Sequence, residues 1–278
     1  MGKSRHQHTY KQHRRRKKLF AHHWTRVFYM QIAAYAVVFV LWILPIPNPV
    51  KLLAVTFHEA SHAIAALLTG GRVFGYAIAP GGAGITLGIG GNMTIILLAG
   101  HVGSCLWGVL LYYMSVRLRP VVCIMCLEGL MLLSIFFGWL NEYTLFFGGG
   151  ALVMMTVAAC FGDPVRLFFV RIVGSACCLY APFDALGELF TRGNAPSVMG
   201  VETVSDIGQL SALTGIPAFL VGFFVIAAQT AVLVWLIRFT CERGAKQAVK
   251  EEIIKSKQKN QILRDIRPDS KDRRIVFK

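Results

Sequence analysis

The sequence has little charge for its length. Charged residues make up 15% and hydrophobic residues 55% of the 278 residues, whereas a typical soluble domain is about 25% charged. The shortage is greatest in the middle, where residues 27–237 hold only seven basic and eight acidic side chains. This composition excludes disordered, collagen-like and small disulfide-bonded proteins. It predicts an integral membrane protein that crosses the bilayer several times.

Most of the positive charge lies at the two ends. Residues 1–26 hold nine Lys and Arg and no acid, and residues 238–278 hold thirteen Lys and Arg against six acids. We therefore expect a basic N-terminal tail at 1–26, a transmembrane core at 27–238 and a basic, polar C-terminal tail at 239–278. Basic flanks beside apolar spans follow from the positive-inside rule and from attraction to anionic lipid. We expect a cytoplasmic N-terminus, and anionic lipid rather than nucleic acid as the partner of the tails.

Seven apolar segments approach or exceed the roughly 17–25 residues that a spanning helix needs. Two basic tails on the same side of the membrane require an even number of crossings. Either one of the seven segments does not cross fully or one tail lies on the other side, so the side of the C-terminus stays open. We therefore expect an all-α polytopic membrane protein with about six to seven transmembrane helices. The segments lie at 27–46, 48–68, 93–114, 120–140, 143–161, 165–189 and 215–238.

Two regions between these segments have a different pattern. Residues 72–90 contain two short strand-like runs around Pro80-Gly-Gly-Ala-Gly84, which predicts a small Gly-rich β-hairpin. Residues 190–214 are polar, and Thr203-Val-Ser-Asp206 precedes a short apolar run. That pattern predicts a short capped helix.

Histidine is nearly absent from the core, where only His58, His62 and His101 occur beyond residue 26. Two of them belong to His58-Glu59-Ala60-Ser61-His62, in a predicted helix that begins at Asn48-Pro49. Residues four apart share one helix face, so both imidazoles can reach one metal ion. This is the H-E-x-x-H pattern of zinc metalloproteases, in which Glu59 meets a metal-bound water. We expect His101 to hydrogen-bond between helices rather than to bind the metal.

A catalytic zinc ion with this motif needs a third protein ligand. Asp184 is our first choice, because Pro182 breaks the local helical ladder and can aim the carboxylate inward. Asp206 is the second candidate, with helix capping as its other role, and Glu128 is a minor one. We expect Glu188, one helical turn beyond Asp184, to support that ligand.

Several stretches of the chain match one family of membrane enzymes. They are Phe57–Arg72 with the motif, the Gly-rich hairpin, Leu98–Ser104, Ser175–Asp184, Ser205-Asp206 and Leu213–Pro217. In these stretches the chain resembles the site-2 protease family of membrane-embedded zinc metalloproteases, in particular its compact branch without a PDZ domain. Better-known members carry Leu-Asp-Gly on a later span. This tripeptide is absent here, and Phe183-Asp184-Ala185 is its nearest counterpart.

The resemblance implies one catalytic zinc ion, held by His58, His62 and Asp184, and a zinc-bound water activated by Glu59 as general base. The implied activity is hydrolysis of peptide bonds in a transmembrane protein substrate, as in regulated intramembrane proteolysis. We expect the 72–90 hairpin to hold the extended substrate segment by strand addition. Two alternatives stay open: a metal carrier that uses the same His/Asp site, and a catalytically inactive membrane scaffold of the same fold.

Overall fold

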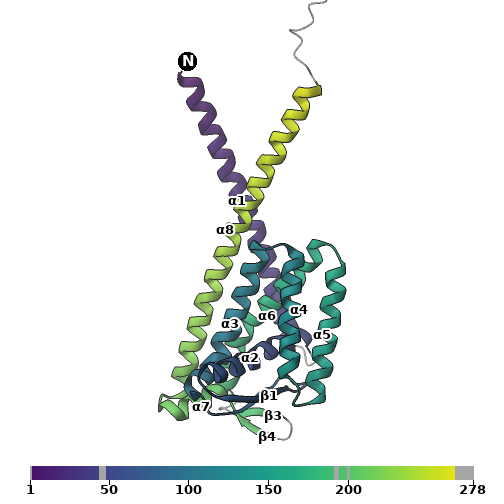
Figure 1. Ribbon diagram of the computed structural model, residues 1–278. Helices are drawn as coiled ribbons and strands as arrows, with labels where there is room; N and C mark the ends of the chain where they lie inside the picture. The colour runs from purple at the N-terminus through teal and green to yellow at the C-terminus, as the bar shows by residue number, and fades with distance from the viewer. Residues whose placement is uncertain (1, 44–47, 191–193, 199–200, 267–278) are drawn as a thin grey trace, which may run out of the picture. The chain divides into compact units, whose positions relative to one another are not determined.

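The computed structural model describes residues 2–43, 48–190, 194–198 and 201–266, and most of them are helical (Figure 1). The helices are α1 (Gly2–Ile43), α2 (Pro49–Leu68), α3 (Met93–Arg117), α4 (Pro120–Phe137), α5 (Glu142–Cys160), α6 (Asp163–Phe190), α7 (Asp206–Thr214) and α8 (Ala218–Ile266). Two antiparallel strand pairs complete the fold: β1 (Arg72–Ile78) with β2 (Gly84–Ile89), and β3 (Asn194–Val198) with β4 (Val201–Val204).

Six helices are long and apolar enough to cross a membrane, which confirms the multi-pass membrane protein expected from the composition. They include the ranges Arg14–Trp42, Met93–Arg117, Pro120–Phe137, Glu142–Cys160, Asp163–Gly187 and Ala218–Leu263. The expected segment at 48–68 does form a helix, α2, but α2 is not one of the six within the described residues. It carries Lys51, Glu59 and two histidines, and most of its side chains are buried by the protein.

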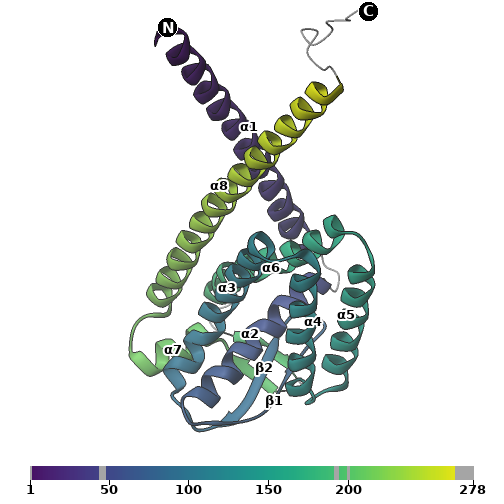
Figure 2. The same cartoon turned by 45° about the horizontal axis from the view of Figure 1, so that its top comes forward.

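The chain divides into two compact units, one made of residues 1–30 and 238–278 and the other of residues 31–237. The second unit contains all the elements from α2 to α7. Within it α3 packs along α6, and α4 packs along α5. Helix α2 contacts α3, α6 and both strands of the first hairpin (Figure 2). The helix that carries the motif is therefore surrounded by the rest of this unit.

The start of α2 is fixed by local chemistry. The Asn48 side chain accepts hydrogen bonds from the backbone N–H groups of Val50 at 2.9 Å and Lys51 at 3.3 Å. Pro49 occupies the first turn, where its missing N–H has no helical partner to lose. Behind this cap, Leu53 and Phe57 are each 1% exposed and belong to the main hydrophobic core. Burial of this apolar face holds α2 in place.

The predicted hairpin at 72–90 is confirmed, and its strand β1 is tied to the neighbouring helices. Ile78 donates its backbone N–H to Thr144 Oγ1 at 2.8 Å, and its carbonyl accepts from Asn141 Nδ2 at 3.0 Å. The Tyr76 hydroxyl donates to the carbonyl of Ser134 at 2.6 Å. Strand β2 pairs only with β1 in the described part of the chain. Neither outer edge of this sheet has a strand partner among the described residues, but the outer edge of β1 is bonded to Thr144 and Asn141.

The turn of the hairpin is attached to the first turn of α2. Lys51 Nζ donates to the Gly81 carbonyl at 3.2 Å. The next residue, Gly82, has φ 82° and lies against the Lys51 side chain. Only glycine adopts this backbone conformation readily and leaves room for the lysine.

The polar region after α6 contains the expected short helix and one feature that was not expected. Helix α7 is capped by Ser205, whose hydroxyl accepts from the Gly208 N–H at 3.1 Å. Ahead of it, β3 and β4 form a second small hairpin in which Asn194 pairs with Val204. The sequence did not reveal these strands, because they are short and polar.

The anchor of β1 on α5 can be tested with Thr144→Val. This change leaves the buried Ile78 N–H without its acceptor, which costs about 1–3 kcal/mol. We expect a lower unfolding midpoint in detergent. Thr156→Val is the matched control, because that exposed hydroxyl donates only to the Leu152 carbonyl one turn back. Equal stability of the two variants would contradict the proposed anchor.

Candidate metal centre

The two motif histidines lie on the buried face of α2, as their spacing of four requires. His58 is 4% and His62 is 6% exposed. Their Nε2 atoms are 3.0 Å apart, and the two rings are nearly perpendicular at 81°. Both rings therefore direct the same nitrogen into one small space.

Asp206, the first residue of α7, enters the same space from a distant part of the chain. Its Oδ2 lies 3.1 Å from His58 Nε2 and 3.0 Å from His62 Nε2. Burial by itself raises the pKa of the Asp206 carboxyl, but the His62 and His58 imidazoles outweigh it and hold that pKa well below its usual range. A metal ion binds the ionised form of such a carboxylate.

The hydrogen bonds behind the imidazoles decide which nitrogen carries the proton. His62 Nδ1 lies 2.7 Å from the Ile96 carbonyl, which can only accept, so Nδ1 donates. His58 Nδ1 lies 3.3 Å from Ser104 Oγ, and the Ser104 hydroxyl donates its own proton to the Gly100 carbonyl at 2.8 Å. Ser104 Oγ is therefore the acceptor for His58 as well. In the neutral form of each imidazole Nε2 therefore holds the lone pair, as in metal-binding histidines.

Three atoms with lone pairs thus face one another at hydrogen-bond distance. They repel unless a proton or a metal cation lies among them. A tetrahedral zinc ion with bonds of about 2.0–2.2 Å holds its ligands about 3.3–3.6 Å apart. The observed separations of 3.0–3.1 Å are a few tenths of an ångström shorter. Two neutral imidazoles and a carboxylate at this spacing fit one zinc ion with only a small adjustment.

Glycine 100 makes room for this arrangement where α3 crosses α2. A Cβ atom built on Gly100 would overlap the ring of His62 and would lie 2.6 Å from Cε1 of His58. In the sequence, Gly100 and Ser104 belong to Leu98–Ser104, one of the stretches that carry the family resemblance. Their part around the imidazoles becomes visible once α3 is known to lie on α2, because residues four apart share the facing side of α3.

Glu59 is buried beside the two histidines, at 4% exposure. The Thr86 hydroxyl, from β2, lies 2.7 Å from Glu59 Oε2 and 3.1 Å from the Glu59 backbone carbonyl. The other carboxylate oxygen, Oε1, lies against Gly84, where a Cβ atom would overlap it. The hairpin thus contacts the motif through its glutamate.

Asp184, the first choice for the third ligand, lies on α6 in a second group of possible ligands. Its carboxylate, a His58 nitrogen and a His101 nitrogen all lie within 4.8 Å of one another. Asp184 therefore reaches one motif histidine, in company with His101. Asp206 is grouped with both motif histidines.

The other two acids considered from the sequence, Glu128 and Glu188, do not change the comparison between Asp184 and Asp206. Glu128 is half-buried on α4 and belongs to neither group of possible ligands among the described residues. The side chain of Glu188 lies outside the described residues, so its expected support of Asp184 stays a prediction.

A comparison with known protein families identifies the family of this chain. The sequence profile of the Peptidase M50B-like family matches residues 31–236, a range that includes both motif histidines, Glu59 and both candidate aspartates. The chain belongs to this family. As an M50B-like peptidase it is a member of the site-2 protease family, so the resemblance is confirmed, and the described residues contain no PDZ domain. No curated protein and no solved structure matches the chain.

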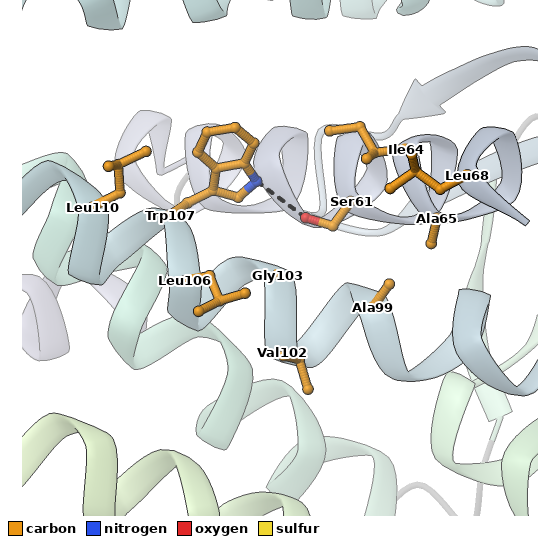
Figure 3. A pocket seen from close by; sticks show the side chains of 10 residues that line it. All are labelled: Ser61, Ile64, Ala65, Leu68, Ala99, Val102, Gly103, Leu106, Trp107 and Leu110. Atoms are coloured by element: carbon orange, nitrogen blue, oxygen red, sulfur yellow. Dashed lines mark hydrogen bonds between the residues drawn. The ribbon is translucent and has the colours of Figure 1, made fainter.

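The M50B-like chain has an apolar groove of about 390 Å³ between α2 and α3, beside the motif (Figure 3). At its floor Trp107 Nε1 donates to Ser61 Oγ at 3.1 Å. The Ser61 hydroxyl in turn donates to the Phe57 carbonyl at 2.7 Å. Both hydrogen-bonding roles of this serine are used in packing, so Ser61 joins the two helices and is not a nucleophile.

The role of Gly100 in this M50B-like site predicts the behaviour of one substitution. Gly100→Ala places a methyl group on the imidazoles, so we expect less than one tenth of the wild-type zinc per purified chain. The helical content should stay unchanged. Gly149→Ala is the control, because a Cβ atom there meets open space. Full zinc occupancy in Gly100→Ala would show that the imidazoles do not meet at this glycine.

Proposed function

We propose that the chain is an intramembrane zinc metalloprotease that hydrolyses peptide bonds of membrane-protein substrates. The observation that carries the proposal is the meeting of His58 Nε2, His62 Nε2 and Asp206 Oδ2 beside a buried Glu59. Membership of the M50B-like peptidases and six candidate membrane spans support it.

For the metal we propose His58, His62 and Asp206 as ligands. Support comes from the distances of 3.0–3.1 Å from Asp206 Oδ2 to both imidazoles. Asp184, which we favoured from the sequence, is the alternative third ligand, because its carboxylate lies near His58 and His101. One zinc ion is proposed, because both groups share His58.

A zinc ion bound there would make a water molecule more acidic and would polarise the scissile carbonyl. Glu59 acts as the general base and takes one proton from the attacking water. As the water oxygen bonds to the carbonyl carbon and the C–N bond breaks, Glu59 returns the proton to the leaving amine. The buried surroundings of the carboxylate strengthen its interaction with the reacting groups.

A substrate must be unwound before its backbone can reach the motif, and β2 offers a place for the extended segment. The far edge of β1 is joined to α5 through Thr144 and Asn141, whereas the outer edge of β2 has no strand partner among the described residues. We propose that the substrate adds as a strand to β2, where backbone hydrogen bonds hold it with little demand on its sequence.

The tails are proposed to lie on anionic lipid at the cytoplasmic face. Residues 1–26 carry nine basic side chains and no acid, and each Lys or Arg near an anionic surface contributes about 1 kcal/mol. Six spans are an even number, which is what two cytoplasmic basic tails require.

Two rival functions use the same fold: a metal carrier and an inactive scaffold. Neither has a use for a buried carboxylate next to the metal ligands. Burying Glu59 without a chemical role would only destabilise the protein. The hydroxyl of Thr86 on its Oε2 therefore favours the protease.

The first test separates the protease from the carrier. Glu59→Gln keeps the shape of the side chain and removes the base, so we expect cleavage of reconstituted transmembrane peptides to fall at least a thousandfold. Bound zinc should remain at the wild-type level. Metal flux into proteoliposomes that survives Glu59→Gln, with no cleavage by the wild type, would favour the carrier.

The second test identifies the third ligand by counting metal. We expect His58→Ala and Asp206→Ala to retain less than one tenth of the wild-type zinc after dialysis against a weak chelator. Asp184→Ala should retain most of it. The reverse order for the two aspartates would restore Asp184 as the ligand.

A further inference from the structure

One hydroxyl group joins the hairpin to the catalytic glutamate. Thr86 Oγ1 lies 2.7 Å from Glu59 Oε2 and 3.1 Å from the Glu59 carbonyl oxygen, so its single proton lies between two acceptors of the same residue. Both acceptors belong to a glutamate that is 4% exposed. A hydrogen bond to a carboxylate is shorter and stronger than one between neutral groups.

This contact restricts the orientation of the Glu59 carboxylate. Because Thr86 donates to Oε2, that oxygen is engaged and the carboxylate is held in one rotamer. Oε1 lies against Gly84, in the space that a side chain at that position would fill. Gly84 and Thr86 are two apart on β2 and face the same way. One strand face therefore contacts both oxygens of Glu59, one through a hydrogen bond and the other through close packing.

The other attachments of the hairpin do not involve Glu59. Lys51 holds the turn through the Gly81 carbonyl, and Thr144 holds the end of β1 through the Ile78 N–H. These contacts fix the position of the hairpin as a whole. Thr86 is the contact through which a shift of β2 moves the base.

We propose that Thr86 is a positioning residue that aligns Glu59 for proton transfer and couples the seating of a substrate strand on β2 to the catalytic base. The inference rests on the proposed proteolysis and adds a residue to it. A substrate that pairs with the outer edge of β2 restricts the motion of this strand. The hydrogen bond from Thr86 then restricts the motion of the Glu59 carboxylate. Substrate binding itself involves the backbone of β2 and does not need the hydroxyl.

The test compares Thr86→Val, which keeps the shape of the side chain, with Thr86→Ser, which keeps the hydroxyl. The probe is the best-cleaved member of a pool of single-span transmembrane peptides in phosphatidylcholine–phosphatidylglycerol vesicles. We expect Thr86→Val to lower kcat about 10- to 100-fold, the effect of losing one hydrogen bond to a charged group. KM should change less than about twofold and zinc content should not change. Thr86→Ser should restore kcat to within about threefold of wild type.

A double-mutant cycle measures the contact without relying on cleavage. Thr86→Val, Glu59→Ala and the double variant are compared by thermal unfolding of the zinc-loaded protein. We expect the Tm change of the double variant to differ from the sum of the two single changes, because both changes remove the same interaction. Thr156→Val, with its exposed hydroxyl, should keep wild-type kcat, KM and Tm.

Each contrary result has a separate meaning. Wild-type kcat in Thr86→Val, an equal loss in Thr86→Ser, a rise in KM without a fall in kcat, or additive Tm changes would each overturn the role of Thr86 while leaving proteolysis intact. A wild-type protein that holds zinc but cleaves none of the peptides would overturn the proposed function, and the role of Thr86 with it.

Discussion

The structure of this site depends on three lone-pair atoms that face one another in a buried space: Nε2 of His58, Nε2 of His62 and Oδ2 of Asp206. Such atoms repel unless they share a positive charge. Packing of the surrounding protein must therefore hold α7 against α2 in spite of this repulsion, and the three atoms offer a site for a cation. The Ile96 carbonyl and the Ser104 hydroxyl hold the imidazoles in place through hydrogen bonds with their Nδ1 atoms. We propose that a metal ion completes this arrangement.

The surrounding elements divide the remaining tasks. Helix α2 is buried on most of its surface and presents its histidines at fixed positions, while Gly100 lets α3 approach them closely. The first hairpin is attached to α2 at its turn and in β2, so the glutamate of the motif is held by a different element from the histidines. Metal binding and proton transfer can therefore be disturbed separately. This separation is what the proposed hydrolase requires, and a carrier or an inert scaffold does not.

The features that the sequence predicts are those with a local physical cause. Apolar segments of spanning length, the spacing of His58 and His62, and the Pro and Gly residues of the 72–90 hairpin are all visible without tertiary structure. The proposed third ligand, Asp206, was only the second candidate from the sequence. Pro182 made Asp184 stand out because a helix break is a local signal, but the position of Asp206 depends on how the chain folds back through α7. The role of Gly100 was missed for the same reason, since it depends on a distant neighbour, whereas β3 and β4 were missed because they are short and polar.

The most direct measurement of the central claim is zinc K-edge X-ray absorption on two cysteine variants of the purified protein. If Asp206 binds the metal, Asp206→Cys brings sulfur into the first shell at about 2.3 Å. Asp184→Cys should then give the same spectrum as the wild type, with only nitrogen and oxygen at about 2.0–2.2 Å. A zinc–sulfur distance in Asp184→Cys and none in Asp206→Cys would contradict the account.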